Sequence, residues 1–364
     1  MNFEAAYRGK RVFITGHTGF KGSWLTEWLL ALGAHVTGYS LPPPTDPALF
    51  DQLGLAARIK HIEADIRDLD RLSAAIVESD PEFVFHLAAQ PLVRLSYDQP
   101  VETYQTNVIG TVHVLEALRS LTTPCVAIFV TTDKCYENRE WLHAYREEDP
   151  LGGYDPYSSS KAAAEIAIAA YRQSFFNPAR RTPVKVASAR AGNVIGGGDW
   201  AQDRIVPDSI RALARGEAIR VRNKNSTRPW QHVLEPLSGY LTLAAALATR
   251  DEEQLCSAFN FGPTLASNRS VEALVNQILK QWPGKWADQS DPNAPHEARL
   301  LNLATDKAFH LLNWSPVWNF ETTAQMTVDW YRQTSELAER EPDIFVRLTQ
   351  AQIRKYEAAR QAGS

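Results

Sequence analysis

Short apolar runs alternate with longer amphipathic segments through the first half of the chain. The short runs are rich in valine, isoleucine and phenylalanine, as buried strands typically are, and they lie at 11–15, 35–39, 59–63, 83–87, 126–130 and 184–189. Between them, apolar positions three and four residues apart predict helices at 22–31, 69–78, 106–118 and 157–176. Alternation of nearly continuous apolar strands with helices is typical of a parallel sheet covered on both faces. The pattern therefore predicts an α/β fold with a doubly wound parallel sheet.

This regular alternation stops near residue 190. Gly196, Gly197 and Gly198, with several proline, asparagine and tryptophan residues, indicate longer loops there. Apolar periodicity still predicts helices near 205–215, 234–250, 271–282 and 322–334, and a tail helix over 342–364 whose end frays. We therefore predict two interleaved domains. The first comprises residues 1–190 and a strand that returns near 230–262, and the second is a smaller mixed domain made mainly of residues 191–364.

Composition and charge exclude several classes of protein. With 44% apolar and 22% charged residues, the 364-residue chain has the make-up of a packed globular protein of about two domains. Its 38 basic and 42 acidic residues give a net charge of −4, which argues against a nucleic-acid partner. The three cysteines lack metal-ligand spacing, and no apolar run approaches the about 18 residues of a membrane span. We expect a soluble, cytoplasmic protein without metal, membrane or nucleic-acid partners.

A glycine-rich turn joins the first predicted strand to the first helix. Glycines at every third position permit a tight turn and let the backbone approach a pyrophosphate, which the helix amino end then attracts. This arrangement predicts a dinucleotide-binding domain of the Rossmann type, and the alternative is a tight strand–helix connection without a ligand. The candidate cofactor contacts in the turn are Gly16, Thr18, Gly19, Phe20, Lys21 and Gly22.

The adenosine end of the predicted cofactor site is less regular. An acidic residue that would bind the ribose hydroxyls of NAD is missing from the end of the second strand, at 38–41, and no arginine stands there for a 2′-phosphate. The pattern alone therefore leaves NAD and NADP open. Asp65 is a candidate acceptor for the adenine amino group, or else it caps the helix that begins near 69. The further candidate cofactor contacts are Ile66, Leu87, Ala88, Ala89, Gln90 and Asn107.

Tyr157 and Lys161 open a predicted helix after the fifth strand. Residues four apart share one helix face, and an ammonium beside a phenol stabilises the phenolate and lowers its pKa. A tyrosine with a lowered pKa is a candidate general base next to a nicotinamide ring. Without the preceding nucleotide-binding pattern, a tyrosine and a lysine at this spacing would be interpreted as ordinary surface or core residues with no catalytic role.

Together, these motifs resemble the extended short-chain dehydrogenase/reductase family, and within it the nucleotide-sugar 4,6-dehydratases. The resemblance rests on the glycine turn, the L-A-A-Q segment at 87–90, Thr132-Asp133 and the Tyr157–Lys161 pair. It covers nearly the whole chain. The segments that resemble the branch acting on CDP-glucose lie at 90–94, 131–136, 196–200 and 228–233. Other branches carry Asp-Glu where this chain has Asp133-Lys134, and many relatives that use NAD carry the acid missing at 38–41.

The resemblance implies conversion of CDP-D-glucose to CDP-4-keto-6-deoxy-D-glucose, with NAD as cofactor and loss of water. Tyr157 is then the base at the C4 hydroxyl, Lys161 is its electrostatic partner, and Thr132 orients the sugar oxygen. Asp133 is the acid that protonates the leaving C6 hydroxyl, which requires that burial raise its pKa. Lys134 is the base at C5, or it remains charged and stabilises the enolate while another group removes the proton.

The substrate and the assembly complete these expectations. The predicted contacts for the nucleotide sugar are Arg94, Asn193, Arg204 and Arg228, since a guanidinium matches phosphate oxygens. Relatives associate through the helix that bears Tyr157 and the helix that begins near 106, so we expect a homodimer or a homotetramer.

Two other functions share parts of this pattern. A nucleotide-sugar 4-epimerase uses the same tyrosine and lysine but needs no acid–base pair for elimination, so Asp133-Lys134 argues against it. A non-catalytic NAD-binding regulator would not need Thr132, Asp133, Tyr157 and Lys161 together.

Overall fold

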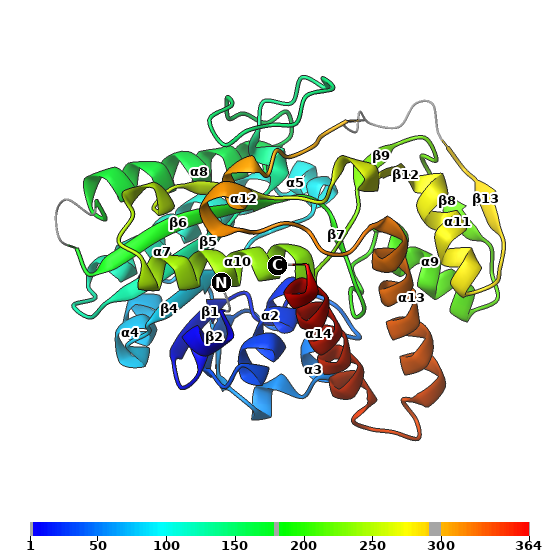
Figure 1. Ribbon diagram of the computed structural model, residues 1–364, viewed down its shortest axis with the longest axis horizontal. Helices are drawn as coiled ribbons and strands as arrows, with labels where there is room; N and C mark the ends of the chain where they lie inside the picture. The colour runs from blue at the N-terminus through cyan, green and yellow to red at the C-terminus, as the bar shows by residue number, and fades with distance from the viewer. Residues whose placement is uncertain (1–2, 178–181, 291–299, 364) are drawn as a thin grey trace.

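The computed structural model describes residues 3–177, 182–290 and 300–363. Its centre is a seven-stranded parallel sheet in the order β11-β6-β5-β4-β1-β2-β3 (Figure 1). The strands are β1 (Arg11–Thr15), β2 (His35–Ser40), β3 (Lys60–Glu63), β4 (Phe83–His86), β5 (Cys125–Val130), β6 (Val184–Ala191) and β11 (Ala258–Phe261). The predicted α/β class and doubly wound parallel sheet are confirmed.

Strand side chains alternate between two buried faces, which explains the continuous apolar runs. Val12 and Ile14 belong to the core on one face, whereas Phe13 belongs to the core on the other. The first face is covered by α2 (Phe20–Ala31), α10 (Leu234–Thr249) and α14 (Ile344–Ala362). The second face is covered by α4 (Leu69–Ser79), α7 (Gly110–Arg119) and α8 (Pro156–Ser174).

The order of the strands places the site. The chain runs outward from β1 to β3 and then crosses back to β4, which pairs with the other edge of β1. In such sheets, ligands bind outside the carboxyl ends of the strands where the order reverses. The glycine turn after β1 and the L-A-A-Q segment after β4 meet at this point.

The remaining elements form a smaller lobe at the right of Figure 1. Its strands are β7 (Val194–Ile195), β8 (Ile219–Val221), β9 (Thr227–Pro229), β10 (Gln231–His232), β12 (Asn268–Ser270) and β13 (Trp286–Asp288), which form two-stranded pairs. Its helices include α9 (Ile205–Ala214), α11 (Val271–Gln281) and α13 (Phe320–Leu337), whereas α12 (Asp306–Leu312) packs on β11 and α10 beside the central sheet.

The tail helix α14 returns from this lobe to the first part of the chain and packs against α2. The indole of Trp28 donates to Glu357 at 2.7 Å, and Gln350 donates to the buried carboxylate of Glu27 at 2.7 Å. The second oxygen of that carboxylate binds Arg58 at 2.6 Å. The last helix is therefore part of the support of the glycine turn.

One predicted helix is interrupted. In place of a single helix over 106–118, the chain forms α6 (Pro100–Tyr104), a π-helical turn, η2 (Gln105–Ile109), and then α7. Asn107 lies inside this turn, where its side chain accepts from the backbone of Gln90 at 2.8 Å and donates to Ser160 at 2.9 Å. The extra residue of a π turn redirects one side chain, a device that is frequent at functional sites and leaves little trace in apolar periodicity.

Candidate active site

The glycine turn is built so tightly that side chains are excluded from it. Gly16 has φ +77°, and a Cβ atom there would lie 2.6 Å from the backbone nitrogen of Ala88. A Cβ at Gly22 would lie 2.1 Å from the carbonyl oxygen of Gly16. The turn thus packs closely on the segment after β4, and α2 packs closely on the turn. There is no room for a side chain at Gly16 or Gly22, so both positions require glycine.

Two features of the turn and its surroundings fit a dinucleotide. No side chain caps the amino end of α2, and a Cβ at Gly19 would meet nothing closer than an oxygen at 3.5 Å, so the first N–H groups of α2 can reach a diphosphate. In the part of the chain that the structure describes, the buried ammonium of Lys161 makes no hydrogen bond or ion pair with protein atoms. A buried charge without a protein partner indicates that a ligand supplies one.

The end of β2 carries hydroxyl groups in place of the acidic residue that commonly binds the ribose of NAD. Ser40, the last residue of β2, shares a 2.8 Å hydrogen bond with Thr18, whose hydroxyl also lies 2.9 Å from the carbonyl oxygen of Leu41. Thr18 thus links the glycine turn to this strand end.

Asp65 does not cap a helix. Its carboxylate accepts from the backbone of Arg67 at 2.9 Å and from the guanidinium of Arg67 at 2.6 Å, while Asp68 caps α4. The capping alternative is therefore wrong, because Asp68 lies directly before the first turn and Asp65 lies three residues too early.

The segment after β4 is held by a side-chain network. Gln90 donates to Thr103 at 2.9 Å and accepts from the backbone of Leu92 at 2.6 Å, in addition to its two bonds with Asn107. Gln90 and Asn107 therefore fix the backbone along which Leu87, Ala88 and Ala89 lie, rather than extending freely toward a ligand. Ile66 is buried and packs close to Gly110, so it contributes to the same wall.

Three candidate catalytic side chains meet at the carboxyl end of β5. The hydroxyl of Thr132 donates to Asp133 at 3.0 Å and lies close enough to Tyr157 to lower the pKa of its phenol. Asp133 is only 3% exposed, and burial raises the pKa of its carboxyl group, although the charges of Lys134 and Arg228 oppose this. This is the direction expected for a general acid.

Tyr157 does not have the lowered pKa that the sequence predicts. Burial raises the pKa of Tyr157 to about 12, although the hydrogen bond with Thr132 and the charge of Arg204 lower it. Burial likewise lowers the pKa of Lys161 to about 8. The prediction of a lowered pKa is wrong for this structure, because the loss of hydration around the phenolate outweighs the neighbouring positive charges.

Local structure explains where Tyr157 lies. Asp155 caps α8 by accepting from the backbone of Ser158 at 2.9 Å, and the backbone N–H of Tyr157 donates to Ser96 at 3.1 Å. Ser96 belongs to α5 (Val93–Asp98), so the first turn of α8 is fixed against the segment that follows β4. The ammonium of Lys134 lies 6.0 Å from the centre of the Tyr157 ring, on the same side of the site as the phenol.

A buried ion pair lies beneath these residues. Glu165 accepts from Arg190 at 2.8 Å, from Thr131 at 2.5 Å and from Ser188 at 2.9 Å. Burial alone would raise the pKa of Glu165, but Arg190 holds it below its usual range. Thr131 precedes the catalytic segment directly, and Arg190 also donates to Tyr136 just after it, at 2.8 Å. One ion pair thus fixes both ends of the segment 132–135.

Replacing Arg190 with methionine should destabilise the protein strongly. The carboxylate of Glu165 would stay buried without its cation, which costs about 3–5 kcal/mol. Urea unfolding of Arg190→Met measures this loss. In the matched double variant Glu165→Gln/Arg190→Met no buried charge remains, and we expect it to regain much of the stability. Equal midpoints for the single and double variants would contradict the role of this ion pair.

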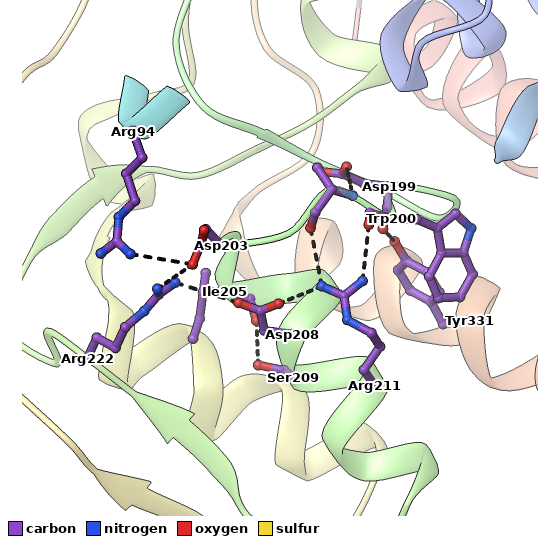
Figure 2. A network of polar contacts seen from close by, with 11 residues as sticks. Arg94, Asp199, Trp200, Asp203, Ile205, Asp208, Ser209, Arg211, Arg222 and Tyr331 are labelled. Carbon is purple, nitrogen blue, oxygen red and sulfur yellow. Dashed lines mark hydrogen bonds and ion pairs between the residues drawn. The ribbon is translucent and has the colours of Figure 1, made fainter. Parts of the chain in front are cut away.

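The predicted substrate residues divide between the interior and the rim of the site. Arg204 donates to Asp199 at 2.9 Å and its charge acts on Tyr157. The charge of Arg228 opposes the rise in the pKa of Asp133. Asn193 directly follows Gly192, whose backbone lies so close to Asp133 that a Cβ atom there would be 2.8 Å from a carboxylate oxygen. In contrast, Arg94 is 60% exposed and lies 3.5 Å from Asp203, at the left of Figure 2.

The structure gives the predicted cofactor contact Lys21 partners inside the protein, and it adds the residues Tyr240, Glu165 and Arg190, which the sequence pattern did not identify. Lys21 reaches away from the turn and donates to the hydroxyl of Tyr240, on α10, at 3.3 Å. Burial lowers the pKa of Lys21 to about 8, and the nearby charges of Arg204 and Lys161 act in the same direction. Glu165 could have been found from its position four residues after Lys161 on one helix face. Tyr240 and Arg190 lie far away in sequence, and no local pattern indicates them.

Two further observations concern metal ligands and membrane spans among the described residues. Among residues 3–177, 182–290 and 300–363, no group of three or more His, Cys, Asp or Glu side chains could hold a metal ion. No helix within these same ranges is long and apolar enough to cross a membrane.

Known proteins resemble this chain along most of its length. Residues 13–327 match the family described as GDP-mannose 4,6 dehydratase. The CDP-glucose 4,6-dehydratase of Salmonella typhimurium is 49% identical over 330 residues, which cover 90% of this chain and 91% of that protein.

Solved structures share the fold at lower identity. A UDP-glucose 4-epimerase from Thermotoga maritima aligns with a TM-score of 0.74 at 22% identity, over 89% of this chain and 99% of that one. A dTDP-glucose 4,6-dehydratase from Streptomyces venezuelae with NAD bound aligns with a TM-score of 0.75 at 22% identity, over 90% and 98% of the two chains. At such identities the likeness establishes only the fold, whereas the family match spans most of the sequence. The chain therefore belongs to the GDP-mannose 4,6-dehydratase family of nucleotide-sugar enzymes.

Proposed function

We propose that this protein is an NAD-dependent dehydratase that converts CDP-D-glucose to CDP-4-keto-6-deoxy-D-glucose. The observation that carries the proposal is the buried carboxyl group of Asp133, which accepts from Thr132 at 3.0 Å and has a raised pKa, next to Tyr157, whose pKa both residues influence. Oxidation at C4 requires a base, the proposed role of Tyr157, and the elimination that follows requires an acid, the proposed role of Asp133. The relative of 49% identity, named for CDP-glucose, supports this choice of nucleotide.

NAD, when bound, supplies a hydride acceptor and a positive charge next to the phenol of Tyr157. Tyr157 takes the proton of the C4 hydroxyl, and Thr132 holds the sugar oxygen through its hydroxyl. Burial raises the pKa of the phenol to about 12, and a cation beside the ring would lower it. We assign the same effect to the ammonium of Lys161, four residues further along α8. We assign the ribose hydroxyls and the diphosphate of NAD to Lys161 and to the amino end of α2.

Elimination then removes water across C5 and C6. The ketone at C4 makes the C5 hydrogen acidic, a base takes that proton, and Asp133 donates its own proton to the leaving C6 hydroxyl. Burial raises the pKa of Asp133 and so favours the protonated carboxyl group that this step needs. Return of the hydride at C6 and of a proton at C5 completes the reaction without net oxidation.

Lys134 is the proposed base at C5, and replacing it with methionine tests this role. If Lys134 removes the C5 proton, Lys134→Met should lower kcat about a hundredfold and stop exchange of the C5 hydrogen with deuterated water. If Lys134 only stabilises the enolate, exchange should become slower but persist. Lys224→Met, which removes an exposed ammonium on the smaller lobe, is a suitable control and should retain full turnover. Retained turnover in Lys134→Met would exclude both roles.

A substrate panel tests the function as a whole. Purified protein is incubated with NAD and with CDP-, dTDP-, GDP- or UDP-linked hexoses, and 4-keto products are detected by their absorbance in alkali. We expect rapid product formation from CDP-glucose alone. A product of unchanged mass would indicate a 4-epimerase instead, and absence of any product would support a non-catalytic regulator.

Assembly and location belong to the same proposal. We propose a homodimer, or a dimer of dimers, because exposed apolar side chains gather on adjacent elements around α8. They are Tyr97, Val101, Ile109 and Ile166, each at least 47% exposed. Light scattering in solution tests this assembly.

The three cysteines are free and buried, as is usual in a reducing compartment, so we place the protein in the cytoplasm. We further propose that residues 1–190 and the strand β11 hold the cofactor and that most of 191–364 holds the nucleotide sugar.

A further inference from the structure

A network of charged side chains lies between α5 and α9 (Figure 2). The carboxylate of Asp203 accepts from Arg222 at 2.5 Å and lies 3.5 Å from Arg94. Arg94 extends from α5 in the first part of the chain, whereas Asp203 and Arg222 belong to the smaller lobe. The carboxylate of Asp203 is thus shared by two guanidinium groups, one from the first part of the chain and one from the smaller lobe.

These contacts are exposed and can be exchanged. The side chains of Arg94, Asp203 and Arg222 are 60%, 52% and 44% exposed, respectively. Among the residues that the structure describes, Asp203 is the one ionic or hydrogen-bonding partner of the Arg94 side chain. Ion pairs in such settings contribute little to stability, so another anion can replace the carboxylate at small cost.

The groups around Asp203 are anchored independently of it. Arg222 also lies 3.6 Å from Asp208, whose other oxygen accepts from Arg211 at 2.5 Å. The preceding loop is fixed by Asp199, which binds Arg204 through its carboxylate at 2.9 Å. Arg222 therefore keeps an anionic neighbour if Asp203 turns away.

Asp203 itself has a backbone conformation that few residues adopt. Its φ is +63°, in the left-handed region where aspartate and asparagine are tolerated better than most side chains. The next residue, Arg204, is half-buried, and its charge lowers the pKa of Tyr157. Ser96, which lies on α5 together with Arg94, accepts from the backbone N–H of Tyr157. Residues next to each end of the Arg94–Asp203 contact thus interact with Tyr157, which places the shared carboxylate beside the proposed catalytic residues.

We propose that Asp203 is an internal competitor for the substrate diphosphate. In the free protein its carboxylate occupies the anion site formed by Arg94 and Arg222, and the diphosphate of the nucleotide sugar displaces it. Phosphate oxygens accept the same paired hydrogen bonds from a guanidinium as a carboxylate does, and a diphosphate carries more negative charge. Arg222 thereby becomes a further diphosphate-binding residue. The choice of ligand rests on the proposed function.

Binding of CDP, measured by calorimetry without turnover, tests this inference. Asp203→Asn keeps the size of the side chain and its tolerance of a positive φ but removes the charge. We expect its Kd for CDP to fall about threefold to tenfold, because the diphosphate no longer competes with two ion pairs. Glu217→Gln removes a charge at an exposed position just beyond α9 and should bind CDP like the unaltered protein.

A second variant and a second ligand complete the test. Arg222→Gln should raise the Kd for CDP about tenfold, whereas the Kd for cytidine, which has no phosphate, should be the same in every variant. A Kd for CDP that is unchanged or higher in Asp203→Asn would overturn the proposal, and so would unaltered CDP binding in Arg222→Gln. If Asp203→Asn fails to fold, Arg222→Gln decides. A protein that binds CDP as expected but leaves CDP-glucose unconverted would contradict the proposed function and leave this inference intact.

Discussion

Replacing Tyr157 with phenylalanine is expected to lower kcat for CDP-glucose about a thousandfold. The phenol is the proposed base for the C4 hydroxyl, and a positioned acid or base contributes about a hundredfold to ten-thousandfold to a rate. Tyr157 is 8% exposed and its backbone N–H donates to Ser96, so we expect the variant to keep its packing and its place on α8. Because the base acts in the first step, we expect neither a 4-keto product nor an oxidised intermediate. Rapid-quench mass spectrometry of the nucleotide sugars checks this.

Tyr154→Phe is the matched control for this prediction. It removes the same hydroxyl group three residues earlier, from a side chain that is 91% exposed, and should leave kcat unchanged. Unaltered circular dichroism in both variants would show that the fold is intact. Turnover of Tyr157→Phe within tenfold of the unaltered protein would contradict the assignment of the base.

Replacing Asp133 with asparagine should separate oxidation from elimination. Asparagine has nearly the same shape, and its amide can still accept from Thr132, but it has no acidic proton for the C6 oxygen. We expect dehydration to slow about a hundredfold to a thousandfold while oxidation at C4 continues. The measurement is the accumulation of a 4-keto nucleotide sugar that retains its C6 oxygen, followed by mass spectrometry after rapid quenching.

Glu148→Gln serves as the control for Asp133→Asn. Its side chain lies in the loop that follows the catalytic segment and is 77% exposed, so loss of its charge should not change the products. Full dehydration by Asp133→Asn would show that another group protonates the leaving hydroxyl. Loss of both oxidation and elimination would indicate that Asp133 is needed to hold Thr132 rather than to donate a proton.

The regular part of the fold could be predicted closely from the sequence because both sheet faces are buried. Continuous apolar runs therefore marked the strands, and β1, for example, has the predicted bounds. The glycine turn was equally readable, since close backbone contact at Gly16 and Gly22 tolerates no other residue. The π turn around Asn107 could not be predicted, because one extra residue in a helix changes the apolar spacing very little.

The site was only partly predictable for a related reason. The spacing correctly predicted that Tyr157 and Lys161 lie on one helix, α8, where both are buried. It carries no information about the loss of hydration around the phenol. The sign of the pKa change in Tyr157 was therefore missed. Contacts across long stretches of sequence, such as Lys21 with Tyr240 and Arg94 with Asp203, arise only when the two lobes meet.

Isotope tracing with CDP-glucose deuterated at C4 tests the central claim most directly. If the C4 deuteride is transferred to NAD beside Tyr157 and returned to C6 after water is eliminated beside Asp133, each molecule of product must be lighter than the substrate by water and must carry the deuterium at C6. We predict this product from the NAD-loaded protein, with its position read by NMR. A product that retains the elements of water, or one whose C6 carries only hydrogen from the solvent, would contradict the account.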